Sequence, residues 1–369
     1  MFRVSAILFN SLRPRRVREV CRLTYSVIMP DAEISRVLGK LGETARIFGP
    51  VQRGTEWAFG PVERAQDLCL DYVTTILPPK KFFTPTRETI FTFDGGAFSR
   101  IEDTIPEEKQ ILLGVHACDV EGFKFLDRVF LGFRSDPRYL RRRNNFLIFA
   151  LTCKTVSDTC FCLSMGTGPG VTSGFDVLMT DIGRKYVMES GSHDGEQALR
   201  SLGLEAATEV DLEAKRAVIE RLKGEFKKSV DIDGMPELCL ASQDHPVWAK
   251  YGRVCLACGQ CGMSCPTCFC FDVRESVDAS LTKGERYREW DVCLLKEFAE
   301  VALGGNFRLE RSARLRQFIC HNLSYGCYQY SMTKCIGCGR CIRICPVDID
   351  ITRIARELRG EKARAEGSP

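Results

Sequence analysis

One cysteine spacing occurs twice in this chain of 369 residues and constrains its fold more than any other feature. The pattern C-x-x-C-x-x-C-x-x-x-C-P runs from Cys255 to Pro266 and again from Cys335 to Pro346. Three thiolates in one tight turn can bind three irons of a cubane, and in two-cluster ferredoxins the fourth Cys of each run binds the other cluster. The two runs therefore predict two [4Fe-4S] clusters and an electron-transfer protein.

The crossed pattern assigns four thiols to each predicted cluster. The expected ligands are, for the first cluster, Cys255, Cys258, Cys261 and Cys345, and, for the second cluster, Cys335, Cys338, Cys341 and Cys265. A zinc ribbon would need two pairs of ligands rather than two quartets with the same internal spacing. A disulfide framework also fits poorly, because residues three apart in such a loop rarely pair and the chain is large.

The remaining composition is that of an ordinary globular protein, large enough for two domains. It is 44% hydrophobic and 27% charged, with a net charge of +4. This charge and the lack of a base-stacking motif argue against nucleic-acid binding, and no apolar stretch approaches the ~20 residues that cross a bilayer. Twenty cysteines together with oxygen-sensitive clusters indicate a reducing cytoplasm.

The sequence pattern predicts an α+β fold, with a mixed α/β domain followed by an α-helical dicluster ferredoxin domain. The expected divisions are a poorly ordered basic N-terminal extension at 1–28, the α/β domain at 29–235, the ferredoxin domain at 236–352 and a charged C-terminal tail at 353–369. The extension is rich in arginine, like a transit peptide, but an upstream start codon explains it as well.

Periodicity predicts several elements within these domains. Ile111–Val115 and Phe146–Leu151 are short apolar runs typical of buried strands, with a helix between them. The alternating residues of 176–188 resemble a hairpin. Between the two cysteine runs we expect a mostly helical segment, because Trp290–Ala302 and Leu309–Leu323 have apolar residues spaced by three and four.

Four further cysteines fall in the α/β domain, two of them at the ends of predicted buried strands. They are Cys118, Cys153, Cys160 and Cys162. Thiols that converge at one edge of a sheet could hold a third [4Fe-4S] cluster, and the glycines after Cys162 would let backbone N–H groups approach its sulfides. The alternative is that these cysteines are buried and inert, which is a common fate for the residue.

Three other cysteines, Cys268, Cys270 and Cys293, have no such quartet. The first two follow Cys265 closely, so they could either tune the second cluster or only pack beside it. A basic run from Arg138 to Arg143 is expected to be a solvated helix end, with a docking patch for an acidic partner as the alternative.

Several segments together resemble one protein family, the iron–sulfur beta subunit of cytosolic NAD(P)-linked nickel–iron hydrogenases (sulfhydrogenases) and the A subunit of anaerobic sulfite reductase. The likeness covers about residues 40 to 352. The segments that carry it are Leu77-Pro78-Pro79-Lys80, His116-Ala117-Cys118-Asp119, Cys160-Phe161-Cys162, Thr180-Asp181-Ile182-Gly183, Cys265-Pro266-Thr267-Cys268-Phe269-Cys270, Trp290-Asp291-Val292-Cys293 and Cys335-Ile336-Gly337-Cys338. Family members usually have a His-Lys pair where this chain has His321-Asn322.

The resemblance implies a relay subunit. Its partners would be a flavin- and NAD(P)-binding reductase subunit and a catalytic subunit of the nickel–iron hydrogenase or sirohaem sulfite reductase type. We expect no catalysis by this chain itself, because it has no nucleophile–base arrangement and no dinucleotide fingerprint. The alternative function is a self-contained flavin and iron–sulfur reductase with its flavin in the N-terminal domain.

Overall fold

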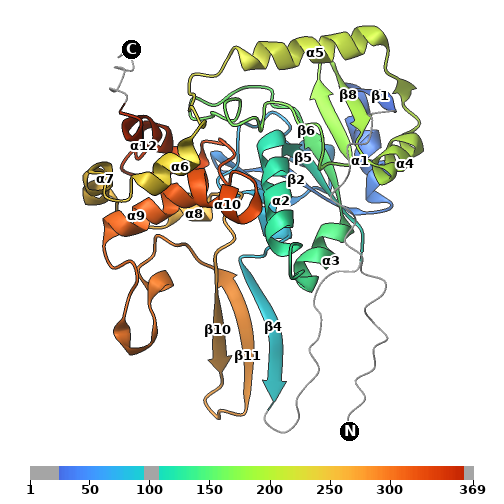
Figure 1. The fold of residues 1–369 in the computed structure, drawn as a ribbon. Coiled ribbons are helices and arrows are strands. Elements are labelled where there is room, and N and C mark those ends of the chain that lie inside the picture. The colour runs from blue at the N-terminus through green and yellow to red at the C-terminus, as the bar shows by residue number, and fades with distance from the viewer. Residues whose placement is uncertain (1–24, 95–107, 361–369) are drawn as a thin grey trace.

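The structure, a computed structural model, describes residues 25–94 and 108–360. An eight-stranded sheet with helices lies beside a group of short helices, and a three-stranded sheet extends away from both (Figure 1). The fold class is α+β, as the sequence predicts. The expected N-terminal extension lies outside the described residues as far as residue 24, but Ser26–Pro30 already forms strand β1. The folded domain therefore begins before the expected boundary at residue 29.

The eight-stranded sheet is mixed, with the order β3-β2-β5-β6-β7-β8-β1-β9. The pairs β2–β5, β5–β6 and β6–β7 are parallel and the others antiparallel. Strand β5 is buried along its whole length, as the strands of a sheet covered on both faces are, which explains its nearly continuous apolar sequence. The strands are β1, β2 (Arg46–Arg53), β3 (Glu56–Pro61), β5 (Gln110–His116), β6 (Phe146–Leu151), β7 (Val177–Asp181), β8 (Lys185–Ser190) and β9 (Glu205–Ala206).

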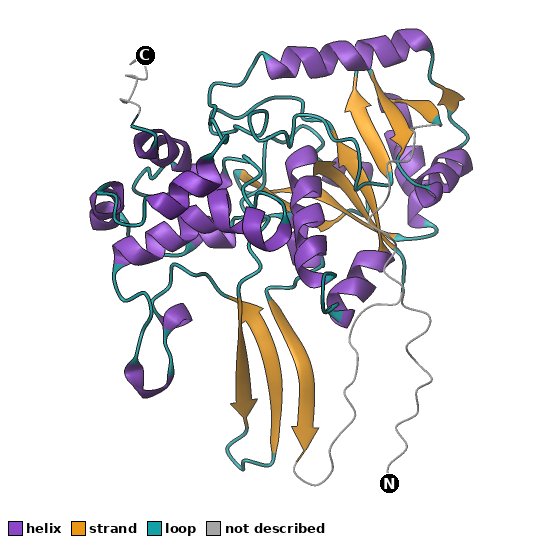
Figure 2. Cartoon of the chain, in the orientation of Figure 1, coloured by secondary structure: helices purple, strands orange, loops and turns teal. Residues whose placement is uncertain are grey.

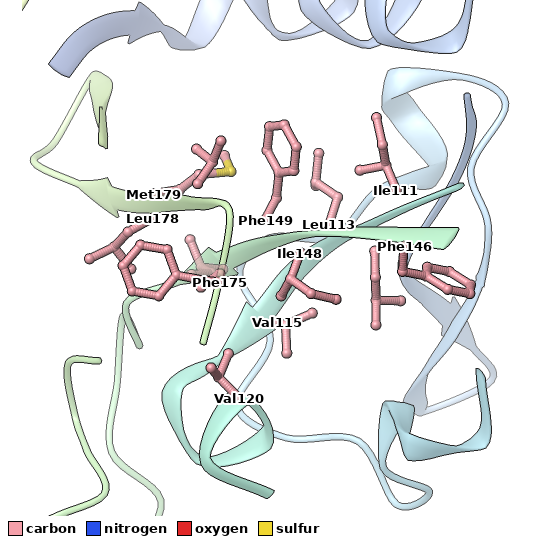
Figure 3. Packing of buried hydrophobic residues seen from close by; sticks show 14 of the residues in the cluster. Ile111, Leu113, Val115, Val120, Phe146, Ile148, Phe149, Phe175, Leu178 and Met179 are labelled. Carbon is pink, nitrogen blue, oxygen red and sulfur yellow. The ribbon is translucent and has the colours of Figure 1, made fainter. Parts of the chain in front are cut away.

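Apolar side chains on both faces of this sheet form the first core. Ile148 and Phe149 of β6 point to opposite faces, as successive strand residues do (Figure 3). Val120 reaches the sheet from the helix that follows β5, so the predicted strand, helix, strand order is confirmed. The helices of this half are α1 (Ile34–Gly42), α2 (Ala117–Phe130), α3 (Pro137–Asn145), α4 (His193–Leu202) and α5 (Glu209–Lys223).

The second half of the chain is built of short helices around a separate core (Figure 2). Phe318 and Ile319 of the longest of these helices pack with Ile354 and Ala355 near the C-terminus. The helices are α6 (Met235–Ala241), α7 (Val247–Val254), α8 (Gln260–Met263), α9 (Arg311–Cys320), a π-helical turn (His321–Tyr325), α10 (Gly326–Tyr330), α11 (Arg340–Arg343) and α12 (Ile351–Leu358).

A three-stranded antiparallel sheet, which we call the arm, projects from the body (Figure 1). Its strands are β4 (Arg87–Asp94), β10 (Phe271–Val277) and β11 (Lys283–Trp290), in the order β10-β11-β4. The hairpin β10–β11 lies between the two cysteine runs, whereas β4 comes from the first half of the chain. The arm therefore joins the two halves through backbone hydrogen bonds.

Short 3₁₀ turns complete the described structure. They are Asp31–Glu33, Ala65–Asp67, Pro79–Phe82, Glu297–Ala299 and Ala302–Gly304. Within residues 25–94 and 108–360, no helix is both long and apolar enough to cross a membrane.

Three further expectations from the sequence are wrong. The segment between the cysteine runs is not mostly helical, because it forms the β10–β11 hairpin and the only helical turns of 290–302 are 3₁₀ turns, although α9 does lie within the expected 309–323. Helix α12 occupies part of the expected tail at 353–369, and its buried face packs in the second core. The arginine run is not a solvated helix end either, since Arg142 and Arg143 are buried and paired with Glu88 and Asp127.

Candidate functional site

Four thiols from the two cysteine runs surround one cavity at the end of helix α7. Cys255 ends that helix, Cys258 and Cys261 lie in and after the following turn, and Cys345 comes from the second run. Gly259, with φ of 76°, makes the tight turn from which helix α8 starts. We call this the first thiol group. It contains the four residues that the sequence assigns to the first cluster.

A second cavity lies directly beside the first. Its thiols belong to Cys265, Cys335, Cys338 and Cys341, which we call the second thiol group. Cys341 lines both cavities, as do the apolar side chains of Phe318 and Ile351. The two groups are therefore neighbours that share a wall, which is the arrangement that crossed runs require.

Backbone and hydroxyl donors approach the sulfur atoms of these groups. The N–H of Ala257 donates to Cys255 Sγ at 3.4 Å, and that of Ile349 donates to Cys345 Sγ at 3.3 Å. The Thr267 hydroxyl lies 3.1 Å from Cys265 Sγ. Donors of this kind stabilise a negatively charged sulfur and tune the potential of a bound iron–sulfur group.

Burial keeps the free thiols protonated. It raises the pKa of Cys335 and of Cys338 to about 12, and it raises the pKa of Cys261, to which the nearby Cys255 and Cys345 thiols add. A thiol of this kind becomes a thiolate at neutral pH only when a cation replaces its proton, as in metal binding. Each described cysteine is a free thiol.

These two groups fit an iron–sulfur cubane better than a single ion. Counting the shared Cys341, five cysteines line the first apolar cavity and four line the second. A [4Fe-4S] cluster takes four thiolates around a body larger than one metal. Among the described residues, no three Cys, His, Asp or Glu side chains converge closely enough to hold a single metal ion. The donor set is all sulfur, which suits iron–sulfur chemistry.

The other predicted quartet, which we call the third thiol group, gathers at the carboxyl edge of the large sheet. Cys118 lies in the first turn of α2, Cys153 follows β6, and Cys160 and Cys162 lie in the next loop. Burial, with the neighbouring Cys160 thiol, raises the pKa of Cys153 to about 12. Burial raises the pKa of Cys118 and of Cys162 as well, with Cys153 close enough to contribute to both.

The loop that carries the third thiol group packs against the second cysteine run. The N–H of Phe161 donates to Gly337 O at 2.8 Å, and the Thr167 hydroxyl donates to Ile336 O at 2.6 Å. Cys160 Sγ lies 3.7 Å from Cys338 O. The second thiol group consequently borders both the first and the third.

A buried ion pair also stabilises the contact between the first half of the chain and the second cysteine run. Arg340 donates to both carboxylate oxygens of Asp119 at 2.7 Å, and its Nε donates to Thr75 O at 2.8 Å. The exposed fractions of the Arg340 and Asp119 side chains are 2% and 0%. Bidentate geometry of this kind fixes relative position as well as adding energy, so helix α2 and the second cysteine run are held in register.

The three remaining cysteines of interest, Cys268, Cys270 and Cys293, lie together beside Cys265 of the second thiol group. The Cys270 thiol hydrogen-bonds with the thiols of Cys268 and Cys293. Two fully buried lysines, Lys80 and Lys334, lie against the same cysteines. Burial lowers the pKa of Lys80 from its usual value, despite the nearby thiols.

Comparison with known proteins agrees with this geometry. The 4Fe-4S dicluster domain family matches residues 254–349, which include both cysteine runs. The sulfhydrogenase 2 subunit beta of Pyrococcus furiosus is 33% identical over 326 residues, covering 87% of this chain and 94% of the relative. The chain belongs to the sulfhydrogenase beta subunit family. It is an iron–sulfur protein of electron transport, and the resemblance to these subunits predicted from the sequence is confirmed.

In this sulfhydrogenase beta-type chain, sequence reasoning found the cysteines but missed the charged residues around them. The segment Leu77–Lys80 carries part of the resemblance without an expected role, yet Lys80 is completely buried beside the second run. Arg340, Asp119 and Asn322 were also missed. Arg340 lies between two cysteines of the second run, and this position is a signal that the sequence offers. A cation in a buried turn needs an anionic partner, so its position predicts a buried ion pair.

Proposed function

We propose that this chain is the electron-relay subunit of an NAD(P)-linked oxidoreductase complex in a reducing cytoplasm. It would hold three [4Fe-4S] clusters, one in each thiol group. The first and second thiol groups contain the eight cysteines of the two runs, in the crossed pairing that their spacing predicts. The observation that carries the proposal is that the crossed quartets line two adjacent cavities.

Bound [4Fe-4S] clusters each exchange one electron, which is the chemistry that a relay needs. The residues of this chain would keep those clusters in a row. Cys338 of the second group borders the third group, and Cys341 borders both the first and second cavities. Phe318 and Ile351 keep water out of the wall between these cavities.

The exposed end of this row is the first thiol group. Cys258 is exposed, and the apolar side chains of Val254 and Leu256 beside it are 50% and 57% exposed. A partner redox subunit that docked here would cover these side chains. We infer that the partners are a flavin- and NAD(P)-binding subunit and a catalytic subunit of the hydrogenase type, since the Pyrococcus relative is named as a sulfhydrogenase subunit.

Iron analysis of the full-length chain, purified without oxygen, tests the cluster assignment. We expect about twelve irons per chain, as three four-iron clusters require. Cys153→Ala should lower the count by about four, because Cys153 belongs to the third thiol group. Cys239→Ala is the control, since Cys239 is a buried free thiol that hydrogen-bonds with the Cys320 thiol instead. Eight irons in all three proteins would reject the third cluster, and iron-free wild-type protein would reject the proposal.

An assay of NAD(P)H oxidation tests whether the isolated chain only relays electrons or also reacts with the nucleotide. The isolated chain should show low-temperature cluster EPR signals but should not oxidise NAD(P)H. Rapid oxidation by the pure chain, together with flavin released by acid precipitation, would instead establish a self-contained reductase.

A further inference from the structure

Two buried ammonium groups lie beside the second thiol group. Lys80 Nζ donates to Cys268 O at 2.5 Å and lies 4.3 Å from the centre of the Trp290 ring. Lys334 Nζ donates to Asn322 Oδ1 at 3.3 Å and lies 5.9 Å from the centre of the Phe318 ring. Each lysine is only 2% exposed. The two side chains come from opposite ends of the chain and meet in its interior.

Neither ammonium group has an anionic protein partner. Within residues 25–94 and 108–360, no ion pair joins Lys80 or Lys334 to a carboxylate, and the oxygens that they contact belong to a peptide and an amide. Burying an ionised amine costs a great deal of free energy unless an opposite charge compensates it. Two such groups side by side also repel each other. A negative charge close to both is therefore needed to keep the two amines ionised.

The second thiol group lies within reach of both lysines. Cys268, which accepts from Lys80, is itself bonded through its N–H to Cys265 O at 3.2 Å. Asn322, which accepts from Lys334, lines the second cavity, and its Oδ1 lies 3.9 Å from Cys265 Sγ. A group bound by these thiols would therefore place negative charge close to both lysines. Four thiolates around an oxidised [4Fe-4S]²⁺ core carry a net charge of about −2, which two ammonium groups would balance.

We propose that Lys80 and Lys334 form a buried cation pair that raises the reduction potential of the centre in the second thiol group above those of the other two. This inference rests on the proposed function, in which Cys265, Cys335, Cys338 and Cys341 hold a [4Fe-4S] cluster. Reduction adds a negative charge, and nearby cations in a medium of low polarity stabilise it.

Cations near the other two thiol groups are placed differently among the residues that the structure describes. Arg314, near the first group, is buried without a carboxylate partner among those residues, but its guanidinium donates to the peptide oxygens of Leu294, Arg308 and Leu309. Arg340 lies close to the third group, but its charge is neutralised by the buried carboxylate of Asp119. Arg311 donates to Cys255 O at 3.0 Å beside the first group, but this residue is exposed, so water screens its charge. Two buried lysines in contact with cysteine residues are found, among the described residues, beside the second group.

A redox titration of the full-length chain, followed by EPR without oxygen, tests the pair. Cys335→Ser identifies the signal of the second centre, because it changes a ligand of that centre alone. Lys80→Met and Lys334→Met should each lower the ratio of reduced to oxidised second centre at least tenfold at a fixed potential, which is 59 mV for one electron. The other two signals should shift much less.

Lys81→Met is the matched control. Lys81 is the next residue along, but its Nζ donates to Phe59 O at 2.6 Å, away from the thiols. The control should leave all three potentials unchanged, and Lys80→Arg, which keeps the charge, should restore most of the shift caused by Lys80→Met. If the methionine variants lose iron, Lys80→Gln and Lys334→Gln decide, since glutamine keeps a polar side chain and removes the charge.

Two kinds of failure can be told apart. Unchanged potentials in iron-complete Lys80→Met and Lys334→Met, or in Lys80→Gln and Lys334→Gln, would overturn the cation pair while leaving the relay intact. Wild-type protein without clusters would overturn the proposed function itself.

Discussion

At the scale of single residues, Glu88 shows how the interior of this protein uses arginine. Its carboxylate accepts from Arg142 at 2.6 Å, from Arg288 at 2.7 Å and from Arg138 at 3.3 Å, and its side chain is only 2% exposed. Arg288 comes from the arm and the other two from helix α3. One carboxylate thus links two elements that are far apart in the sequence.

Removing this carboxylate should be costly. Glu88→Ala would leave buried guanidinium groups without their partner, so we expect a loss of about 3–5 kcal/mol in the free energy of unfolding. Glu56→Ala is the control, because Glu56 pairs with Arg343 at 2.6 Å but its side chain is 37% exposed, and it should cost about 1 kcal/mol or less. Urea denaturation measures both, and equal losses would contradict a buried role for Glu88.

At the scale of elements, Asp136 joins helix α3 to the arm. It is the N-cap of α3, and its Oδ1 accepts from the N–H groups of Arg138 and Tyr139 at 2.8 Å and 3.0 Å. Its Oδ2 accepts from Arg288 of β11 at 2.5 Å. Burial opposes ionisation, but the Arg288 guanidinium and the two N–H groups outweigh it and hold the pKa of Asp136 below its usual value.

This lowered pKa predicts a dependence of stability on pH. The charge of Asp136 stabilises the fold above the pKa of the unfolded chain, about 3.9, and its contribution is lost as the pH falls through the lower folded value. Asp136→Asn keeps the capping oxygen and removes the charge, so we expect it to cost about 1 kcal/mol at pH 7. The difference from wild type should shrink below about pH 4. A difference that stays constant in urea denaturation at about pH 7 and about pH 3 would contradict this.

The sequence predicts elements best where local pattern and burial agree. Strands β5 and β6 are apolar runs in the middle of the sheet, and the hairpin β7–β8 alternates as a hairpin should. The apolar spacing of 290–302 predicted a helix wrongly. Trp290 ends strand β11, where its indole N–H donates to Thr84 O at 2.8 Å, and Val292 and Leu294 insert into the second core.

Some residues of the candidate site could be predicted from the sequence, and others could not. The cysteine quartets could be assigned from spacing alone, because three of each four ligands lie within seven residues. Lys80 and Asp119 could not be placed, since they reach the cysteine runs only through contacts between the two halves of the chain. Nothing local distinguishes Lys80 from Lys81, which bonds elsewhere.

At the scale of the whole molecule, the two halves meet so closely that side chains are excluded. A Cβ on Gly337 would lie 2.6 Å from both Cα and N of Cys162, and Gly337 has φ of 68°. Only glycine satisfies both demands, for space and for backbone conformation. The position of the third thiol group against the second run therefore depends on this residue.

A comparison of Gly337→Ala with Gly166→Ala should separate the effect of the missing space from the effect of the positive φ. Gly166 has the same φ of 68°, but a methyl group added there would meet nothing within 4 Å, so its replacement should cost only about 1–2 kcal/mol of backbone strain. Gly337→Ala adds a collision with backbone, and we expect a larger loss of unfolding free energy together with a lower iron content. Denaturation and iron analysis measure these effects, and matching results for the two variants would contradict the close docking.

The arm combines strands from distant parts of the chain, and this affects how it forms during synthesis on the ribosome. Thr89 of β4 hydrogen-bonds to Glu285 of β11, which is 196 residues later in the chain. At roughly 5–20 residues per second, β4 waits about 10–40 s for its partner strand. During that time its edge can pair with another nascent chain. A gene truncated before β11 would leave that edge open permanently, so its product should aggregate.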